Sequence, residues 1–364
     1  MPQDYIARWK KVAAAAAAKG IDLTLISPSS DMTYLCGYAH KPSDRPTLLV
    51  ISEARDPFIV APLLEAQKVR VKTQGLFEVM AWDETQDPFG LTRDTLRTRI
   101  SSMAVAEQMW AGDLLRLKTH FEDAHVMSAQ PLIAPLRMRK SEEELDLLRK
   151  AGCAADKAYD MLCQFKLSGM SEKEVQQELM HLLMQAGTPE AFCLVATGEN
   201  TSSPHHEVSD RIVHERDAVW VDFGGKCEGY NADCTRTLHV GSPQSEYVRV
   251  YDIVRRAQET TVLSIRPGMT CQEVDRIARS IIQDAGYGAS FIHRTGHGLG
   301  LDVHEHPYIV EGNHQVLEPG MVFSVEPGIY ITGSFGVRIE DIVAVTNDGV
   351  EVLNNSTHDM LILH

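Results

Sequence analysis

Apolar and polar residues alternate along the first 130 residues in two different patterns. Short apolar runs typical of β-strands occur at Asp22–Ser27, Thr47–Ser52, Pro57–Pro62, Phe77–Trp82 and Gln108–Gly112. Segments with the pattern of helices lie between them, among them Leu63–Val71 and Thr92–Met103. This alternation predicts a layered α/β domain.

The alternation stops at Gln130–Pro135, where two prolines bracket a stretch that we expect to be extended. We therefore place a domain boundary here, which predicts an N-terminal domain of residues 1–132 and a C-terminal domain of residues 133–364. Shortly after the boundary, Ser141 and Glu144 have the spacing of a capping box. A long amphipathic helix is predicted to begin there.

The C-terminal domain contains the same helix signature twice. Ser171 with Glu174, and Thr270 with Glu273, are capping boxes 99 residues apart. The glycines that end the two predicted helices, Gly187 and Gly286, have the same offset with no gap. A gapless match at both helix ends indicates an internal duplication.

The first half of this duplication places two carboxylates on a predicted hairpin. If the turn is centred between Cys227 and Glu228, Asp222 lies directly opposite Asp233. Two like charges in this arrangement destabilise a sheet, and apolar surroundings increase the penalty. A shift in strand register would relieve the repulsion, and so would a bound cation.

The second half repeats the arrangement independently. Two predicted strands meet at a turn centred on Gly333, and this register places Glu326 opposite Glu340. Duplicated hairpins that meet at a pseudo-twofold axis would bring the four carboxylates together around one or two divalent cations. Any one of these acids is ordinarily a solvated strand residue, but four at duplicated positions favour a metal site.

Three loop histidines add candidate ligands and proton carriers. His297 is flanked by Gly296 and Gly298, and glycine allows the backbone to approach a ligand closely. Imidazole binds Mn, Co, Zn and Fe, so His297 is a candidate ligand. His304 follows seven residues later and His205 precedes the first hairpin; either is a candidate for proton transfer. Taken singly, each is equally typical of an ordinary loop histidine.

The charge of the chain is concentrated in its C-terminal part. Up to Leu136 there are 15 Lys and Arg against 16 Asp and Glu, whereas from Arg137 onward there are 20 against 34. An acidic domain of this kind repels phosphate backbones, so we expect no nucleic-acid partner.

The apolar runs and the cysteines indicate in which cellular compartment the protein is found. The longest early apolar run, Val12–Ala18, is far shorter than the roughly 18–20 residues that span a bilayer, so we expect no membrane segment. The Ala-rich start lacks the features of a signal peptide. Seven dispersed cysteines without a CxxC pair favour free thiols in a reducing compartment. We therefore expect a cytoplasmic protein.

Several segments together resemble one family of metal-dependent peptidases. They are Asp222–Gly224, Gly229–Thr237, His293–Glu305, Phe323–Tyr330 and Gly336–Asp341. In order and spacing they resemble the Xaa-Pro dipeptidases (prolidases) and aminopeptidase P, which share the pita-bread fold. The resemblance implies an α+β protein: a C-terminal pita-bread catalytic domain with pseudo-twofold internal duplication, preceded by a smaller creatinase-like α/β domain.

The resemblance also implies a dinuclear metal site. Asp222 would bind one cation, His297 and Glu326 the other, and Asp233 and Glu340 would bridge the two. Mn²⁺ is the expected metal, with Co²⁺, Fe²⁺ and Zn²⁺ as alternatives.

The same comparison implies four residues that act in catalysis. Glu326 would accept a proton from the attacking water as well as bind metal. His205 and His304 match histidines that handle the substrate and the proton for the leaving nitrogen, and Arg338 matches an arginine that orients a carboxylate. The residues of the proline pocket are not identifiable from the sequence.

The expected reaction is hydrolysis of the bond before proline in small peptides with proline at the second position, foremost Xaa-Pro dipeptides. Aminopeptidase action on longer Xaa-Pro peptides is the first alternative. A second is a pita-bread relative that acts on another small amide, of the ectoine or creatine type, and a third is a metal-free binding protein on the same fold. The resemblance also favours a homodimer.

Overall fold

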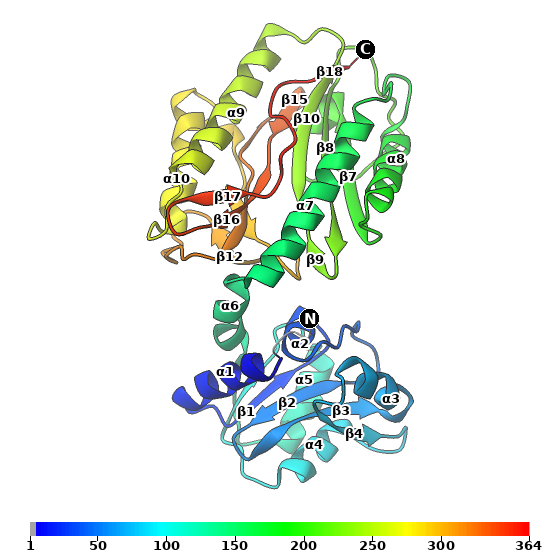
Figure 1. Ribbon diagram of the computed structural model, residues 1–364, viewed down its shortest axis with the longest axis vertical. Helices are drawn as coiled ribbons and strands as arrows, with labels where there is room; N and C mark the ends of the chain where they lie inside the picture. The colour runs from blue at the N-terminus through cyan, green and yellow to red at the C-terminus, as the bar shows by residue number, and fades with distance from the viewer. Residues whose placement is uncertain (1–4, 364) are drawn as a thin grey trace. The chain divides into compact units, whose positions relative to one another are not determined.

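The chain folds into two compact units, Met1–Arg137 and Met138–His364 (Figure 1). The structure is a computed structural model that describes residues 5–363. The boundary predicted after residue 132 lies within a helix, α6 (Gln130–Met138), that runs up to the division between the units.

The N-terminal unit is built on a six-stranded mixed sheet with the order β4-β3-β2-β1-β5-β6. β1 pairs antiparallel with β2 and parallel with β5. The strands are β1 (Leu23–Ile26), β2 (Leu48–Ser52), β3 (Arg55–Pro62), β4 (Glu78–Trp82), β5 (Ser102–Val105) and β6 (His125–Ser128). The helices are α1 (Tyr5–Ala18), α2 (Ser30–Cys36), α3 (Leu63–Lys72), α4 (Pro88–Leu96) and α5 (Ala111–His120). Four of the five predicted strands are confirmed.

The fifth predicted strand is wrong. Residues 108–112 form a turn and the start of α5, and the strand is β5, inside the segment predicted as a helix. The helix α4 ends earlier than predicted, because Arg97 adopts a left-handed conformation with φ 50°. Asp22 then accepts hydrogen bonds from the backbone N–H groups of Ser101 and Ser102 at 2.7 and 3.0 Å, which brings the next residues into the sheet beside β1.

The prediction of an extended stretch at residues 130–135 is also wrong, because these residues form the helix α6. Pro131 lies in the first turn, where a missing N–H does no harm, whereas Pro135 lies inside the helix and removes one backbone hydrogen bond. Leu132 and Ile133 are buried on the helix, and burying apolar side chains offsets the lost bond.

The first half of the C-terminal unit packs two helices on a sheet that is antiparallel except for its edge strand β18, which pairs parallel to β10. The helices are α7 (Glu142–Leu162) and α8 (Glu172–Gln185). The sheet has the order β18-β10-β8-β7, with a short β9 paired to β8. Its strands are β7 (Ala191–Thr197), β8 (Ala218–Cys227), β9 (Tyr230–Asn231), β10 (Cys234–Val240) and β18 (Ile362–Leu363), and a 3₁₀ turn, η1 (Gly198–Ser202), follows β7.

The second half also has two helices and a five-stranded sheet, with a small two-stranded sheet in addition. Its helices are α9 (Ser245–Ser264) and α10 (Cys271–Asp284), and its sheet has the order β12-β11-β13-β16-β17. The strands are β11 (Gly296–Gly298), β12 (Glu305–Ile309), β13 (Val322–Val325), β16 (Asp341–Val345) and β17 (Val350–Val352), and η2 (Gly288–Ser290) precedes β11. β14 (Gly328–Ile331) and β15 (Phe335–Arg338) form a separate two-stranded sheet. In Figure 1, α9 and α10 lie on one side of these strands and α8 on the other.

The repeated helix signature forms as predicted in both halves. Ser171 and Thr270 each accept a hydrogen bond from the N–H of the residue three positions on, and the glutamate there reaches back to the cap. Gly187 and Gly286 follow the helix ends with φ of 108° and 90°, a conformation that glycine adopts without strain. The two helices α8 and α10 therefore begin and end by the same local rules.

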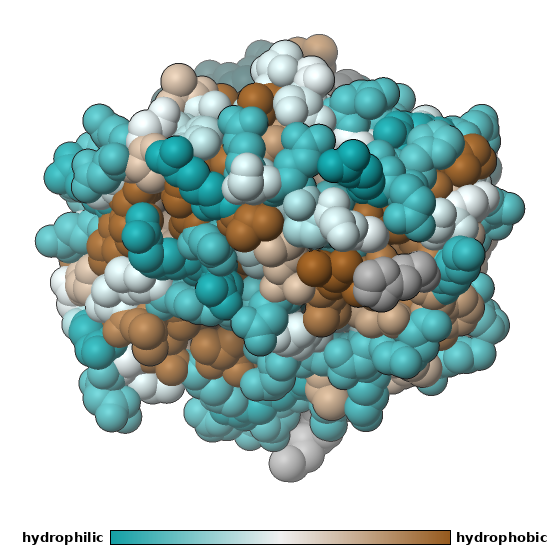
Figure 2. All heavy atoms as spheres, turned by 90° about the horizontal axis from the view of Figure 1, so that it is seen from above, coloured by the Kyte–Doolittle hydropathy of each residue, from teal (hydrophilic) through white to brown (hydrophobic). Residues whose placement is uncertain are grey.

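A shared core joins the two halves. Apolar side chains of α7 and of the first sheet, such as Leu148 and Val221, pack in one buried cluster with Val322 and Ile342 of the second sheet. Figure 2 shows one face of the molecule on which hydrophilic residues surround small separate groups of hydrophobic ones. None of the helices within residues 5–363 is long and apolar enough to cross a membrane.

The equivalent N-caps of α8 and α10 allow the duplication to be tested by measuring the free energy of unfolding. We expect Ser171→Ala and Thr270→Ala each to lower the free energy of unfolding by about 1 kcal/mol, because each removes one capping hydrogen bond. Urea denaturation measures both. Ser245→Ala, at the exposed start of α9, is the control and should change stability by less than about 0.5 kcal/mol. A clearly unequal pair of losses would contradict equivalence of the two caps.

Candidate metal centre

The first carboxylate hairpin forms, but its register differs from the prediction. Cys227 pairs with Tyr230 across a two-residue turn, so Asp222 lies opposite Thr235 rather than opposite Asp233. The two turn residues, Glu228 and Gly229, both have positive φ, 47° and 91°, as a type I′ turn requires. The turn centre is therefore one residue later than predicted, and this moves every cross-strand partner by two.

The second hairpin has the predicted register. Val325 pairs with Asp341 and Gly328 with Arg338, so the ladder is centred on Gly333 as predicted. Glu326 and Glu340 lie between these two pairs, where both strands are interrupted. The carboxylates thus occupy the point at which the chain passes from the β13–β16 sheet to the β14–β15 sheet.

The two hairpins bring acidic side chains together around His297. Ligand atoms of Asp233, His297 and Glu340 lie within 4.8 Å of one another. The Nε2 atom of His297 is 3.3 Å from Glu326 Oε1 and 3.6 Å from Asp233 Oδ2. All of these side chains are buried or nearly so. The structure therefore brings together four of the five predicted ligand residues directly.

Asp222 joins the cluster through an arginine. Its Oδ2 atom accepts a hydrogen bond of 2.7 Å from Arg338, which is itself 3% exposed. Arg338 also donates to Thr235 Oγ1 at 2.9 Å, and Thr235 donates in turn to Glu340 Oε2 at 2.6 Å. One buried guanidinium thus contacts carboxylates of both hairpins, directly or through one hydroxyl.

The glycines beside His297 leave room for neighbouring backbone. A Cβ atom on Gly296 would lie 1.8 Å from the carbonyl oxygen of Ser324, and one on Gly298 would lie 2.3 Å from that of His306. Only glycine fits at these positions. They allow β11 to lie close to its neighbours, so that the imidazole of His297 reaches the carboxylates.

The electrostatics of the cluster indicate a missing positive charge. Burial, reinforced by repulsion from Glu340, raises the pKa of Asp233 well above its usual range. Burial and repulsion from Glu326 do the same for Glu340. Burial, together with Asp222, raises the pKa of Glu326 to about 7 although Arg338 opposes the shift. Three carboxyl groups that disfavour one another's ionisation are destabilising unless a cation binds between them.

Two further observations fit a cation. The Oδ1 atom of Asp233 is buried without a hydrogen-bond partner among the described residues, and such an atom is costly unless something else binds it. Burial and the nearby His304 lower the pKa of His297 to about 3, so its imidazole is neutral and able to coordinate a metal. The oxygen-rich set with one nitrogen suits divalent cations such as Mn²⁺.

The two other predicted histidines differ in how closely they approach the cluster. The ring of His304 lies edge-on to that of His297, with centroids 4.1 Å apart, and burial lowers its pKa. His205 is exposed, and its charge acts on the pKa values of His304 and His293. His304 is therefore part of the cluster, whereas His205 lies at its solvent side.

Two residues that were not predicted extend the contacts of Arg338: Tyr330 binds it directly, and His293 binds Tyr330. Tyr330 accepts a hydrogen bond of 2.9 Å from Arg338, and its hydroxyl lies 3.0 Å from Nε2 of His293. Burial raises the pKa of Tyr330 to about 12, and burial with Arg338 lowers that of His293 to about 4, so both are neutral. Both belong to the quoted segments, but their mutual contact depends on folding and has no local signal.

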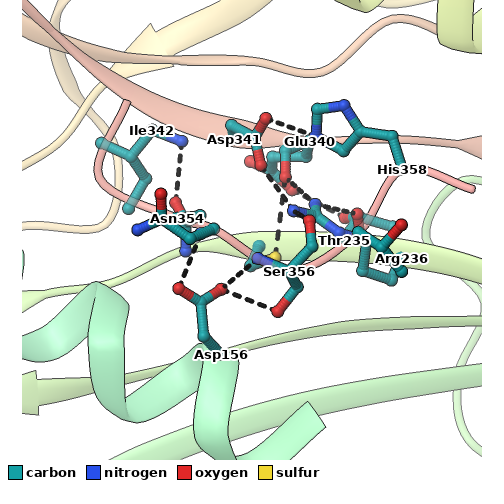
Figure 3. Close-up of polar contacts among 12 residues, drawn as sticks. Asp156, Thr235, Arg236, Glu340, Asp341, Ile342, Asn354, Ser356 and His358 are labelled. Carbon is teal, nitrogen blue, oxygen red and sulfur yellow. Dashed lines mark hydrogen bonds and ion pairs between the residues drawn. The ribbon is translucent and has the colours of Figure 1, made fainter. Parts of the chain in front are cut away.

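A second buried network lies behind Glu340 (Figure 3). Arg236 donates to the carbonyl oxygen of Glu340 at 2.6 Å and to Asp341 Oδ1 at 2.7 Å. His358 and Gln258 contact the other oxygen of Asp341. This network fixes the backbone on either side of Glu340, and its charges balance without involving the cluster.

Comparison with known proteins identifies relatives for both units. Metallopeptidase family M24 matches residues 146–347, and the creatinase/prolidase N-terminal domain matches residues 8–139. Among curated proteins, the probable dipeptidase PepE of Mycobacterium tuberculosis is 40% identical over 99% of this chain and 96% of its own. The Xaa-Pro dipeptidase of Lactobacillus delbrueckii subsp. lactis is 33% identical over 94% of this chain and 95% of its own.

Solved structures agree. The prolidase of Thermococcus sibiricus has a TM-score of 0.95 and 35% identity, and each chain is covered completely. The dipeptidase PepE of Mycobacterium ulcerans has a TM-score of 0.95 and 37% identity over 99% of this chain and 98% of its own. The predicted fold class, a creatinase-like domain followed by a pita-bread domain, is confirmed.

The charge conflict within the cluster predicts an unusual stability change. We expect Asp233→Asn to raise the free energy of unfolding of the chelator-treated protein by about 1–2 kcal/mol, the scale of one pKa unit, because it removes a carboxyl group that costs stability here whether it is ionised or protonated. Thermal unfolding in EDTA measures this. In the wild type alone, added Mn²⁺ should then raise the melting temperature.

A buried aspartate outside the cluster provides the matched control. The carboxylate of Asp156 accepts hydrogen bonds from Asn355 N, Ser356 N and Ser356 Oγ, so Asp156→Asn should lower stability in EDTA. If Asp233→Asn were as destabilising as Asp156→Asn, the carboxylates around His297 would not be in conflict.

Proposed function

The chain belongs to metallopeptidase family M24, and from this membership we propose that it hydrolyses the peptide bond before proline in Xaa-Pro dipeptides. The observation that carries the proposal is the buried group of Asp233, His297, Glu326 and Glu340, whose three carboxylates are only partly offset by the buried Arg338. Relatives named Xaa-Pro dipeptidase and prolidase that match nearly the whole chain support the substrate class. We propose that residues 133–364 form the catalytic domain and that residues 1–132 form a creatinase-like N-terminal domain.

Five side chains would hold two divalent cations in this enzyme. Asp222 would bind one and His297 with Glu326 the other, while Asp233 and Glu340 would bridge them. We propose Mn²⁺ as the native metal, since a set of carboxylates with one imidazole accepts it readily. When bound, divalent cations polarise a scissile carbonyl and make water a nucleophile at neutral pH.

Glu326 is suited to take up the proton of the attacking water. Its Oε1 atom lies 3.3 Å from His297 Nε2, so the carboxylate stands beside the position where a bound cation would activate water, within reach of its proton. Ser324 Oγ donates to Glu326 Oε1 at 3.2 Å and holds the carboxylate in place.

The leaving group of an Xaa-Pro bond is a ring nitrogen that carries no hydrogen, so it needs a proton before it departs. His304 packs against His297 and is the side chain that we propose as donor, with His205 at the solvent side assisting. Arg338 is held by Asp222, Thr235 and Tyr330, and would orient a substrate carboxylate beside the metal ligands.

We further propose that the enzyme works in the cytoplasm as a homodimer. The free state of its seven cysteines is typical of a reducing compartment. The homodimer is an inference from the resemblance to prolidases, and size-exclusion chromatography with light scattering tests it. A mass of about twice the 40.5 kDa chain supports the dimer, and a monomer mass contradicts it.

The first experiment measures hydrolysis by the Mn²⁺-reconstituted enzyme. We expect cleavage of Ala-Pro and Leu-Pro, slower cleavage of an Xaa-Pro-Xaa tripeptide, and no cleavage by Asp233→Ala, which lacks a proposed bridging ligand. Faster turnover of the tripeptide would instead assign an Xaa-Pro aminopeptidase. Two bound metals per chain without cleavage of any Xaa-Pro substrate would reject the peptidase and point to another small amide, such as an ectoine- or creatine-type substrate.

A second experiment tests the proton donor. We expect His304→Gln to lower kcat on Ala-Pro about 10²–10⁴-fold, the range for loss of a general acid, while two metals stay bound. His205→Gln should have a smaller effect, because His205 is exposed. Steady-state kinetics with metal analysis measures both, and an unchanged kcat in His304→Gln would remove His304 from the mechanism.

A further inference from the structure

The loop that carries His304 has little regular structure of its own. It connects β11, which ends at Gly298, to β12, which begins at Glu305. A loop of this kind holds a side chain in one position only if other parts of the fold anchor it. The structure provides two anchors, one from each side.

The first anchor comes from the first carboxylate hairpin. The backbone N–H of Asn231 donates to the carbonyl oxygen of Gly300 at 2.9 Å. Its side-chain amide donates to the same oxygen at 2.8 Å and to that of Leu301 at 3.0 Å. These contacts hold the beginning of the loop, and the second anchor acts at its far end, beside His304.

The second anchor is a buried ion pair. Lys140 Nζ lies 2.9 Å from Glu305 Oε1, and the two side chains are only 1% and 7% exposed. Glu305 directly follows His304, and its other oxygen accepts a hydrogen bond of 3.5 Å from the N–H of Asp302. The Glu305 carboxylate therefore binds the backbone of its own loop. The Lys140 ammonium, which lies outside the loop, binds the same carboxylate.

The base of Lys140 is fixed. Its backbone N–H donates to the carbonyl oxygen of Gly320 at 2.8 Å, and the next residue, Ser141, is the cap of α7. Gly300 provides the room for the pair, because a Cβ atom there would lie 2.8 Å from Glu305 Oε1 and 3.1 Å from Lys140 Cε. The pair is therefore packed between the start of α7 and the His304 loop.

We propose that Lys140 is a positioning residue for His304, acting through its ion pair with Glu305. An ion pair removed from water contributes little net stability, but it holds both side chains in one geometry, and removing one partner disturbs the other. Loss of Lys140 would take away the 2.9 Å contact that ties Glu305 to the start of α7, and the adjacent His304 would shift with it. The catalytic consequence rests on the proposed function, whereas the position of the His304 ring does not.

The test compares Lys140→Met, Glu305→Gln and the double variant with the wild type. We expect Lys140→Met to lower kcat on Ala-Pro by tenfold or more with KM changed less than threefold, because proton delivery suffers rather than substrate binding. The double variant removes both charges of the pair and should recover part of the loss. Arg149→Met is the control, since it breaks a partly exposed pair with Glu351, and should leave kcat unchanged.

A readout independent of activity is the imidazole resonance of His304 in the zinc-loaded protein, identified by its absence in His304→Gln. We expect this resonance to shift in Lys140→Met and to remain in place in Arg149→Met. An unmoved resonance together with kcat within twofold of the wild type overturns the proposal. If the wild type cleaves no Xaa-Pro substrate, the proposed function fails, and the resonance alone decides whether Lys140 positions His304.

A milder variant covers the case in which Lys140→Met does not fold. Gly300→Ala keeps both charges but pushes a methyl group toward the pair. We expect a shift of the His304 resonance and a smaller fall in kcat. An unmoved resonance in folded Gly300→Ala would overturn the proposal as well.

Discussion

The burial of several like-charged carboxylates in one small space is the constraint on which the C-terminal unit depends. Asp233, Glu326 and Glu340 each resist ionisation because the other carboxylates are near and water is excluded. A sheet cannot accept such a group in regular pairing, and both strands of the second hairpin are interrupted where Glu326 and Glu340 occur. The surrounding fold must hold these side chains against their repulsion until cations bind between them.

The fold meets this constraint with two buried arginines in different roles. Arg338 faces the cluster and contacts Asp222 directly and Glu340 through Thr235, so it lowers the repulsion without filling the space between the acids. Arg236 lies behind Glu340, where it pairs with the carboxylate of Asp341 and also donates to backbone oxygens of the hairpin and of the C-terminal segment (Figure 3). One arginine thus tunes the charge of the site, and the other fixes the backbone that presents it.

Local rules explain which features could be predicted from the sequence. Capping boxes, helix-ending glycines and the hairpin centred on Gly333 depend on neighbouring residues, and all three were predicted correctly. The predicted turn of the first hairpin was wrong by one residue, because the positive φ of Glu228 and Gly229 places the turn centre between them. The prediction of an extended stretch at residues 130–135 was wrong, because burial of the apolar residues of α6 outweighs the cost of its prolines. Contacts such as Lys140 with Glu305, or Tyr330 with His293, join residues far apart in the chain and carry no local signal.

The two halves place their histidine segments in a similar way, although the carboxylates that do so lie at different positions of the duplicated helices. In the first half, Glu172 of α8 accepts hydrogen bonds from Ser209, Asn200 and His206, and although burial opposes ionisation these bonds lower its pKa to about 2. It thereby fixes the loop of His205. In the second half, Asp275 of α10 accepts hydrogen bonds from the backbone and hydroxyl of Thr295, two residues before His297. Each half therefore uses a buried carboxylate of its capped helix to fix a histidine segment. His304 is held differently, by Asn231 and Lys140 of the first half against a loop of the second, so its position depends on how the two halves pack.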